Sequence, residues 1–181
     1  RRYVPVALAL ATPNLMGVPP EMVHSLAAQG SLARTWDGVL RAIRHRSPFF
    51  ENVVRREGCR LLHAQSGAEA VYAVGLKART GLPLITTFHG SDIGAPPRRN
   101  QKLYRRLFAE GDLFLACSEA VRKQLLTLGC PEDRLEIQHL GVDTARIPFQ
   151  EREAPEDGPI NVLWVGQMVE RKGLPYALRA F

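Results

Sequence analysis

The stretch PLITTFHGSD, residues 83–92, is the one around which the rest of the chain can be interpreted. Residues 84–88 are β-branched and mostly apolar, which predicts a short buried strand. The sequence then turns abruptly polar and includes Gly90, a residue type that lets a backbone bend or approach a ligand. In a parallel α/β sheet, this switch lies at the carboxyl end of a strand, where such folds bind ligands. His89 and Asp92 are therefore candidate site residues, although an ordinary βα turn has the same pattern.

On both sides of this stretch, short apolar strands alternate with amphipathic helices. The expected strands are 4–11, 60–65, 84–88, 112–117 and 135–140. The expected helices are 21–29, 35–57 (restarting at Ser47-Pro48), 68–80, 100–110 and the segment that follows Ser118, with a loop at 89–97. This alternation predicts an α/β fold: a Rossmann-like parallel sheet with helices on both faces.

Polar residues lie at the carboxyl end of each of the later strands, and we expect them on one edge of the sheet. They are His63, His89, Ser118, and Gly141 with Asp143. Four such strand ends together are a stronger signal than any one of them. Each also has an ordinary interpretation, since Ser118 suits a helix cap and Asp143 suits a turn.

The composition limits the classes of function. Lys and Arg number 24 against 18 Asp and Glu, a net charge of +6, with basic residues clustered in 41–46, 55–56 and 98–106. Such clusters are typical of solvated helix faces, or of surfaces that attract anionic membranes or phosphorylated substrates. No nucleic-acid-binding signature accompanies them, so no nucleic acid partner is expected. Three unpaired cysteines favour a reducing cytoplasm over a disulfide framework or a zinc site, and no apolar run is long enough to span a membrane.

The last 35 residues differ from what precedes them. Residues 147–159 are proline-rich, charged and aperiodic, which predicts a linker between domains. Residues 160–165 read as a strand, 166–173 as a tight loop, and 174–181 as the start of a helix. We therefore expect one domain at 1–146. Residues 160–181 are then the first βα unit of a second domain. Neither a dinucleotide fingerprint nor a P-loop is present.

With these elements in place, residues 59–181 resemble the GT-B-fold, retaining glycosyltransferases of family 4, in particular bacterial members that build exopolysaccharides such as colanic acid. The segments that carry the resemblance are LLHAQ (61–65), GLPLITTFHGSD (81–92), LYRRLF (103–108), DLFLACSEAVRKQLLTLGCP (112–131), IQHLGVD (137–143) and VLWVGQMVERKGLPYALRAF (162–181).

The resemblance implies two Rossmann-like domains that face a cleft, one for the acceptor and one for a nucleotide-diphosphate sugar. It places His89 at the reaction centre as the catalytic residue. Substrate-binding residues are then Gly90, Asp92, His63, Ser118 and Asp143, and the donor diphosphate lies against Gly166, Gln167, Arg171, Lys172 and Gly173. Cations before a helix N-terminus suit a diphosphate on physical grounds as well. The implied enzyme is a hexosyltransferase-type transferase that needs no cofactor and no metal.

The implied partners are a nucleotide sugar and a glycan or lipid-linked acceptor. From its charge, the basic helix at 98–106 is further expected to make peripheral contact with an anionic membrane at the cytoplasmic face. This family usually has arginine where Gln167 stands, and often a second histidine where Gln65 stands. The family's N-terminal glycine loop and its E-x7-E carboxylates are not in this sequence. By this resemblance we expect an internal fragment that is inactive alone, with a domain at 1–146 that lacks its first strand. Alternatives are a non-catalytic glycan- or nucleotide-binding module and a GT-B epimerase or phosphorylase.

Overall fold

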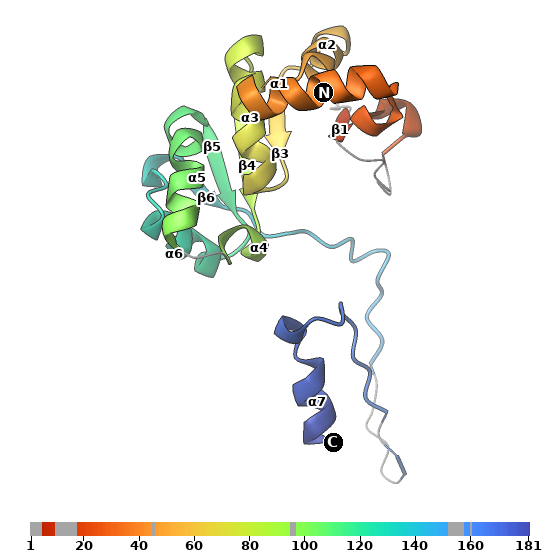
Figure 1. The fold of residues 1–181 in the computed structure, drawn as a ribbon. Helices are drawn as coiled ribbons and strands as arrows, with labels where there is room; N and C mark the ends of the chain where they lie inside the picture. The colour runs from red at the N-terminus through yellow and green to blue at the C-terminus, as the bar shows by residue number, and fades with distance from the viewer. Residues whose placement is uncertain (1–4, 10–17, 45, 95–96, 152–157, 160) are drawn as a thin grey trace. The chain divides into compact units, whose positions relative to one another are not determined.

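The computed structural model describes residues 5–9, 18–44, 46–94, 97–151, 158–159 and 161–181 (Figure 1). These residues form two compact units, Arg1–Gly141 and Val142–Phe181, each of which is described by itself. The boundary between the units falls a few residues before the boundary predicted from the sequence, after residue 146. No helix among the described residues is long and apolar enough to cross a membrane.

The first unit is built on a four-stranded parallel sheet in the order β3-β4-β5-β6 (Figure 1). Its strands are β3 (Leu62–Ala64), β4 (Leu84–Phe88), β5 (Leu113–Ala116) and β6 (Leu135–Ile137). All four were predicted, and β4 has the predicted bounds. The last strand ends at residue 137 rather than 140, because only residues 135–137 align with a neighbouring strand, β5.

Helices connect these strands. They are α3 (Gly67–Thr80), α4 (Gly90–Ile93), α5 (Pro97–Glu110) and α6 (Glu119–Thr127). Because the strands follow one another in sequence order, right-handed crossovers place α3, α5 and α6 on the same face of the sheet. The predicted class, a Rossmann-like parallel sheet flanked by helices, is confirmed. The predicted loop at 89–97 is wrong in part, since residues 90–93 form a helical turn. His89 is its N-cap, and Asp92 accepts a hydrogen bond from the His89 N–H.

An aromatic cluster between α5 and the sheet forms the centre of the core. Phe88 contacts Tyr104 edge-on, with ring centroids 5.4 Å apart, and Phe108 contacts Phe114 in the same manner at 5.5 Å. Phe88 and Phe114 are fully buried and Tyr104 is 2% exposed. On the opposite face of the sheet, Ile85 and Leu115 are only partly buried. The even-numbered positions of β4 therefore pack into the core, and β4 ends at Phe88, one of its most buried side chains.

The N-terminal part of this unit departs from the prediction at one place. Strand β1 (Ala7–Ala9) pairs in parallel with β2 (Val23–Ser25), so the predicted helix at 21–29 is wrong. The chain between the two 3₁₀ turns η1 (Pro20–Met22) and η2 (Leu26–Ala28) is extended, since pairing with β1 overrides a weak helical pattern. Helices α1 (Ser31–Arg44) and α2 (Pro48–Arg56) follow as predicted. The Ser47 hydroxyl caps α2 by accepting from the Phe50 N–H at 3.3 Å.

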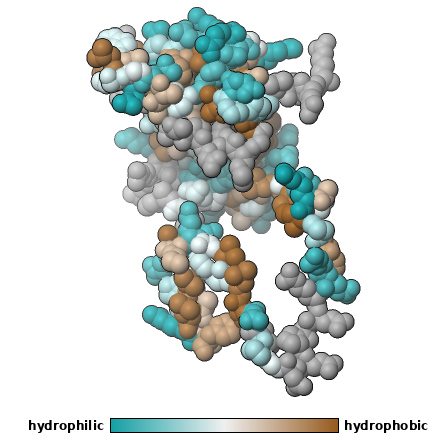
Figure 2. All heavy atoms as spheres, turned by 90° about the vertical axis from the view of Figure 1, so that its right-hand side faces the viewer, coloured by the Kyte–Doolittle hydropathy of each residue, from teal (hydrophilic) through white to brown (hydrophobic). Residues whose placement is uncertain are grey.

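The second unit contains η4 (Glu170–Lys172) and α7 (Leu174–Ala180). The strand predicted at 160–165 is wrong for residues 161–165, which form no strand; residue 160 lies outside the described residues. A strand requires a neighbour that accepts and donates its backbone hydrogen bonds, and the described part of this unit offers none. Large hydrophobic side chains of this unit are therefore exposed, including Leu163 (86%) and Met168 (87%). Figure 2 shows hydrophobic side chains on the surface. Of the predicted linker, residues 147–151 and 158–159 are irregular and 152–157 lie outside the described residues.

Candidate functional site

The turn after β4 places His89. This residue is the N-cap of α4, with an extended backbone and a half-buried side chain. Its N–H donates to Asp92 Oδ2 at 2.7 Å, and the Asp92 N–H donates back to the His89 carbonyl at 3.0 Å. These reciprocal bonds close the turn, as in a capping box. The backbone that carries the imidazole is therefore held by contacts within the turn.

Asp92 also connects this turn to two other helices. Its second carboxylate oxygen, Oδ1, accepts from the Gly67 N–H at 3.2 Å, at the start of α3. Its backbone carbonyl accepts from the Tyr104 hydroxyl of α5 at 2.9 Å. Both carboxylate oxygens thus accept backbone N–H groups of this chain. The substrate-binding role assigned to Asp92 stays a prediction. Gly90, beside it, is exposed and has open space where a side chain would extend.

His63 lies within β3 rather than after its end, which corrects the prediction. Alternation along a three-residue strand buries Leu62 and Ala64 and turns His63 to the other face. There its Nε2 lies 2.8 Å from Thr87 Oγ1, on the neighbouring strand β4. Partial burial lowers the pKa of His63 below its ordinary value of 6.5, because burial penalises the charged imidazolium. The Gln65 amide is within 3.5 Å of the same ring.

Ser118 and His89 leave neighbouring strands on the same edge of the sheet. The Cys117 N–H donates to the Phe88 carbonyl at 3.3 Å, so the residues that follow β4 and β5 diverge from adjacent points. The Ser118 hydroxyl accepts from the Val121 N–H at 3.3 Å and caps α6. The helix-cap interpretation of Ser118 is therefore confirmed, and its contact with substrate stays a prediction.

Gly141 and Asp143 do not directly follow a strand, because β6 ends at Ile137. Gly141 is the last residue of the first unit, and Asp143 belongs to the second. Asp143 is exposed, and its Oδ1 accepts from the Ala145 N–H at 3.1 Å, which makes it a turn residue. The structure thus brings His63, His89 and Ser118 together on one sheet, and relates neither Asp143 nor the second unit to them.

The residues predicted to hold a diphosphate form a compact loop in the second unit. The Trp164 indole N–H donates to the Lys172 carbonyl at 3.3 Å, and Gly166 lies against the Trp164 ring, where a Cβ would be 3.1 Å from a ring carbon. Gly173, with φ of +77°, adopts the left-handed conformation that favours glycine and joins η4 to α7. Gln167 and Lys172 are exposed, and the side chain of Arg171 lies outside the described residues.

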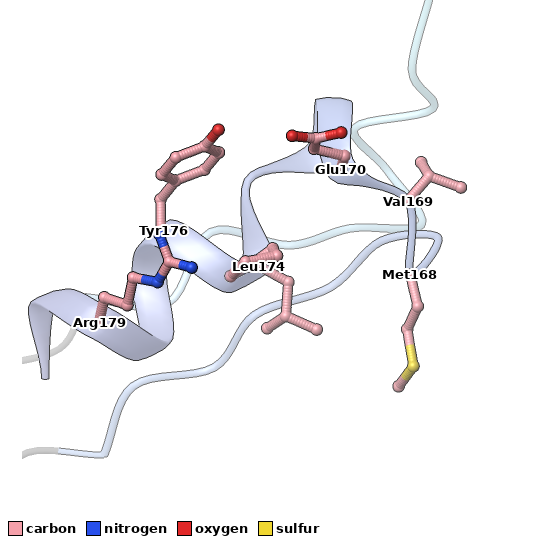
Figure 3. Close-up of a pocket in the computed structure, with 7 residues that line it drawn as sticks. Met168, Val169, Glu170, Leu174, Tyr176 and Arg179 are labelled. Carbon is pink, nitrogen blue, oxygen red and sulfur yellow. The ribbon is translucent and has the colours of Figure 1, made fainter.

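A pocket of about 450 Å³ lies beside this loop (Figure 3). Its lining is Met168, Val169, Glu170, Leu174, Pro175, Tyr176 and Arg179. The lining is largely apolar and includes neither Gln167 nor Lys172, so it is distinct from the predicted diphosphate contacts. Among the residues that the structure describes, no group of three or more His, Cys, Asp or Glu side chains is placed to hold a metal ion.

Two residues that hydrogen-bond to the candidate site residues were not predicted from the sequence. Thr87 reads as an ordinary strand residue, yet its hydroxyl is the partner of His63. Tyr104 lies in the helix that the sequence marks by its basic residues, yet its hydroxyl donates a hydrogen bond to the Asp92 carbonyl in the His89 turn. The only available signal was the helical spacing of Tyr104 with Leu107 and Phe108, which marks a buried stripe and says nothing of its hydroxyl.

The fold and these residues define an α/β protein with candidate ligand-binding groups on the carboxyl edge of a parallel sheet. The model for Glycosyltransferase Family 4 matches residues 6–146, and the chain belongs to this family. The resemblance to glycosyltransferase family 4 that was drawn from the sequence is therefore confirmed, and the retaining mechanism stays a prediction.

Three similar proteins illustrate the relationship. The chain is 32% identical over 98 residues to the amylovoran biosynthesis glycosyltransferase AmsK of Erwinia amylovora, covering 53% of this chain and 24% of that protein. It is 33% identical over 99 residues to the putative colanic acid biosynthesis glycosyltransferase WcaL of Escherichia coli K12, covering 54% and 24%. It is 27% identical over 129 residues to a glycogen synthase of Mycobacterium tuberculosis, covering 66% and 31%. The matches thus span about a quarter to a third of these relatives.

Proposed function

We propose that this chain is the acceptor-side part of a glycosyltransferase that moves a sugar from a nucleotide-diphosphate sugar to a glycan or lipid-linked acceptor. The observation that carries the proposal is His89, held at the carboxyl end of the inner strand β4 in a member of glycosyltransferase family 4. The names of AmsK and WcaL support polysaccharide biosynthesis as the setting. That the transferred sugar is a hexosyl group is part of this proposal. Retention of the anomeric configuration is part of this proposal.

The chemistry requires charge stabilisation at the donor. As the glycosidic bond to the diphosphate breaks, the departing oxygen gains negative charge, and fixed cations and N–H groups near it lower the barrier. In this proposal Lys172 and Arg171 supply the positive charge, and the loop from Gly166 through Gln167 to Gly173 supplies backbone N–H groups. His89 lies near the transferring sugar, and His63 and Ser118 contact the acceptor. No cofactor takes part.

A lipid-linked acceptor would lie at a membrane surface, and α5 carries exposed positive charge that can attract anionic lipids. Lys102, Arg105 and Arg106 are exposed while Tyr104 and Leu107 are buried, so α5 presents a basic outer face. We propose that this face contacts anionic lipid headgroups on the cytoplasmic side. Binding to vesicles that contain phosphatidylglycerol should then weaken steeply with added salt. Salt-insensitive binding, or none at low salt, would remove the membrane from the proposal.

The test of the transferase activity uses the full-length protein and a radiolabelled nucleotide sugar. We expect transfer to be lost in His89→Ala and in Lys172→Ala, and unchanged in Lys123→Ala, an exposed lysine of α6 that serves as the matched control. Transfer that persists in both site variants would refute the site. A wild-type protein that binds the nucleotide sugar without transferring it would identify a non-catalytic module.

A further inference from the structure

The residue whose contacts the transferase chemistry does not explain is Asp92. It is adjacent to the proposed reaction centre, and its type suits a substrate ligand. Its two carboxylate oxygens nevertheless point at backbone N–H groups of this chain: Oδ2 at His89 (2.7 Å) and Oδ1 at Gly67 (3.2 Å). Hydrogen bonds to an ionised carboxylate are the stronger kind. Asp92 therefore ties His89, the residue that follows β4, to the first residue of α3.

The backbone carbonyl of Asp92 is also hydrogen-bonded, to a residue of the core. Its carbonyl accepts from the hydroxyl of Tyr104, a residue 2% exposed whose ring lies edge-on against Phe88. Burial, with the nearby Asp92 charge, raises the pKa of Tyr104 to about 12, so the hydroxyl stays protonated and donates throughout the physiological range. One residue thus receives hydrogen bonds from α3, from the strand end and from α5.

The first turn of α3 also contributes to this arrangement, through its backbone N–H groups and through Gly67. Of the first backbone N–H groups of this 14-residue helix, that of Glu69 is taken by the Ser66 hydroxyl at 3.2 Å, and that of Gly67 is taken by Asp92. A carboxylate at a helix N-terminus is favoured because the unpaired N–H groups there carry partial positive charge. Position 67 also has no room for a side chain, since a Cβ would lie 2.5 Å from Phe88 Cε1. The first residue of α3 therefore lies directly against the rings of Phe88 and Tyr104.

We propose that Asp92 is a positioning residue: it fixes the backbone of His89 before substrate arrives, and it does not bind the substrate itself. A site that is already ordered gains rate because no binding energy is used to order it. The proposal rests on the transferase function for its kinetic consequence. Its structural part, the ordering of the turn by Asp92 and Tyr104, is independent of that function.

The structural part is tested in this chain by amide hydrogen exchange. Asp92→Asn keeps the side-chain shape but presents an NH₂ group to one of the two N–H donors, so one bond is lost. We expect exchange to accelerate about tenfold at the amide that loses its bond, that of His89 or that of Gly67, which is the effect of losing one charge-assisted hydrogen bond. The amide of Phe114 in β5 should be unaffected, which separates loosening of the turn from global unfolding. Asp133→Asn, an exposed carboxylate, is the matched control. Unchanged exchange at both the His89 and the Gly67 amides would overturn the proposal.

The kinetic part is tested in the full-length protein. In both Asp92→Asn and Tyr104→Phe we expect kcat to fall while the KM values for donor and acceptor stay unchanged. Tyr104 is buried and cannot touch substrate, so a shared phenotype with a less-than-additive double variant identifies one structural unit. A selective rise in KM for Asp92→Asn would instead make Asp92 a substrate ligand and refute the inference. If Asp92→Asn fails to fold, Tyr104→Phe alone decides, since it keeps the ring packing. Absence of transfer in the wild type would defeat the proposed function and leave the exchange result standing.

Discussion

Gly67→Ala is the substitution for which the structure gives the most definite consequence. A Cβ at this position would lie 2.5 Å from Phe88 Cε1, 2.7 Å from the Tyr104 hydroxyl oxygen and 2.9 Å from Tyr104 Cζ. Relief of the closest contact requires the rings to move by about 1 Å, because buried carbon pairs pack at about 3.5 Å or more. Both rings are enclosed, Phe88 fully and Tyr104 at 2% exposure, so neither can move without disturbing the core.

We expect Gly67→Ala to lower the free energy of unfolding by about 3 kcal/mol, the upper end of the usual range for overpacking a core. For a small domain that unfolds in urea with a slope of about 1–3 kcal/mol per M, the midpoint should fall by roughly 1–3 M. Urea denaturation followed by far-ultraviolet circular dichroism measures it.

The matched control is Gly38→Ala, in the interior of α1, where nothing lies within 4 Å of the added carbon. Alanine is the better helix former there by about 0.5–1 kcal/mol, so this variant should be at least as stable as the wild type. If Gly67→Ala unfolds at the wild-type midpoint, the close approach of α3 to Phe88 is wrong, and with it the anchoring of Asp92.

Three further outcomes follow from local features. Burial lowers the pKa of His63 in the folded state, so the unfolded chain binds more protons below pH 6.5. The free energy of unfolding should therefore fall as the pH drops through that value. His63→Gln should flatten this part of the curve of unfolding midpoint against pH. Burial raises the pKa of the Cys130 thiol to about 12, so iodoacetamide should alkylate it only after unfolding, and rapid labelling of the native chain at Cys130 would contradict its burial. Ser118→Ala removes the cap of α6 and should cost about 1 kcal/mol in urea titrations, while Thr127→Ala at the far end of α6 serves for comparison.

The sequence was sufficient for the main sheet because its local signals agree with the tertiary arrangement. Residues 84–88 have strand propensity, Gly81 ends the preceding helix with φ of +69°, and Ser118 caps the following one. Each signal depends on a few neighbouring residues, which a single sequence displays. The helix predicted at 21–29 failed for the opposite reason, since Val23–Ser25 is extended only through its pairing with Ala7–Ala9. Pairing between distant segments leaves little trace in local pattern.

The candidate site was predictable in residue type and less so in role. The polar residues after β4 and β5 were found from the switch between apolar and polar sequence, and they lie on adjacent points of one edge. Which of them hold one another could not be found in this way. The bond from Gly67 to Asp92 spans 25 positions and that from His63 to Thr87 spans 24, and no periodicity connects such pairs.

The dependence of His89 on the core has a consequence for interpreting variants of this protein. Phe88 belongs to β4, fills the space left by Gly67 and packs against Tyr104, and it directly precedes His89. A smaller side chain at Phe88 would therefore weaken the core and also release the Tyr104 ring whose hydroxyl holds Asp92. Loss of transfer in such a variant would not separate instability from misplacement of His89. Tyr104→Phe separates them, because it removes a single hydrogen bond of about 1 kcal/mol and leaves the aromatic packing in place. A fall in kcat there, with stability nearly unchanged, would show that the core contributes to function through the position of one backbone turn.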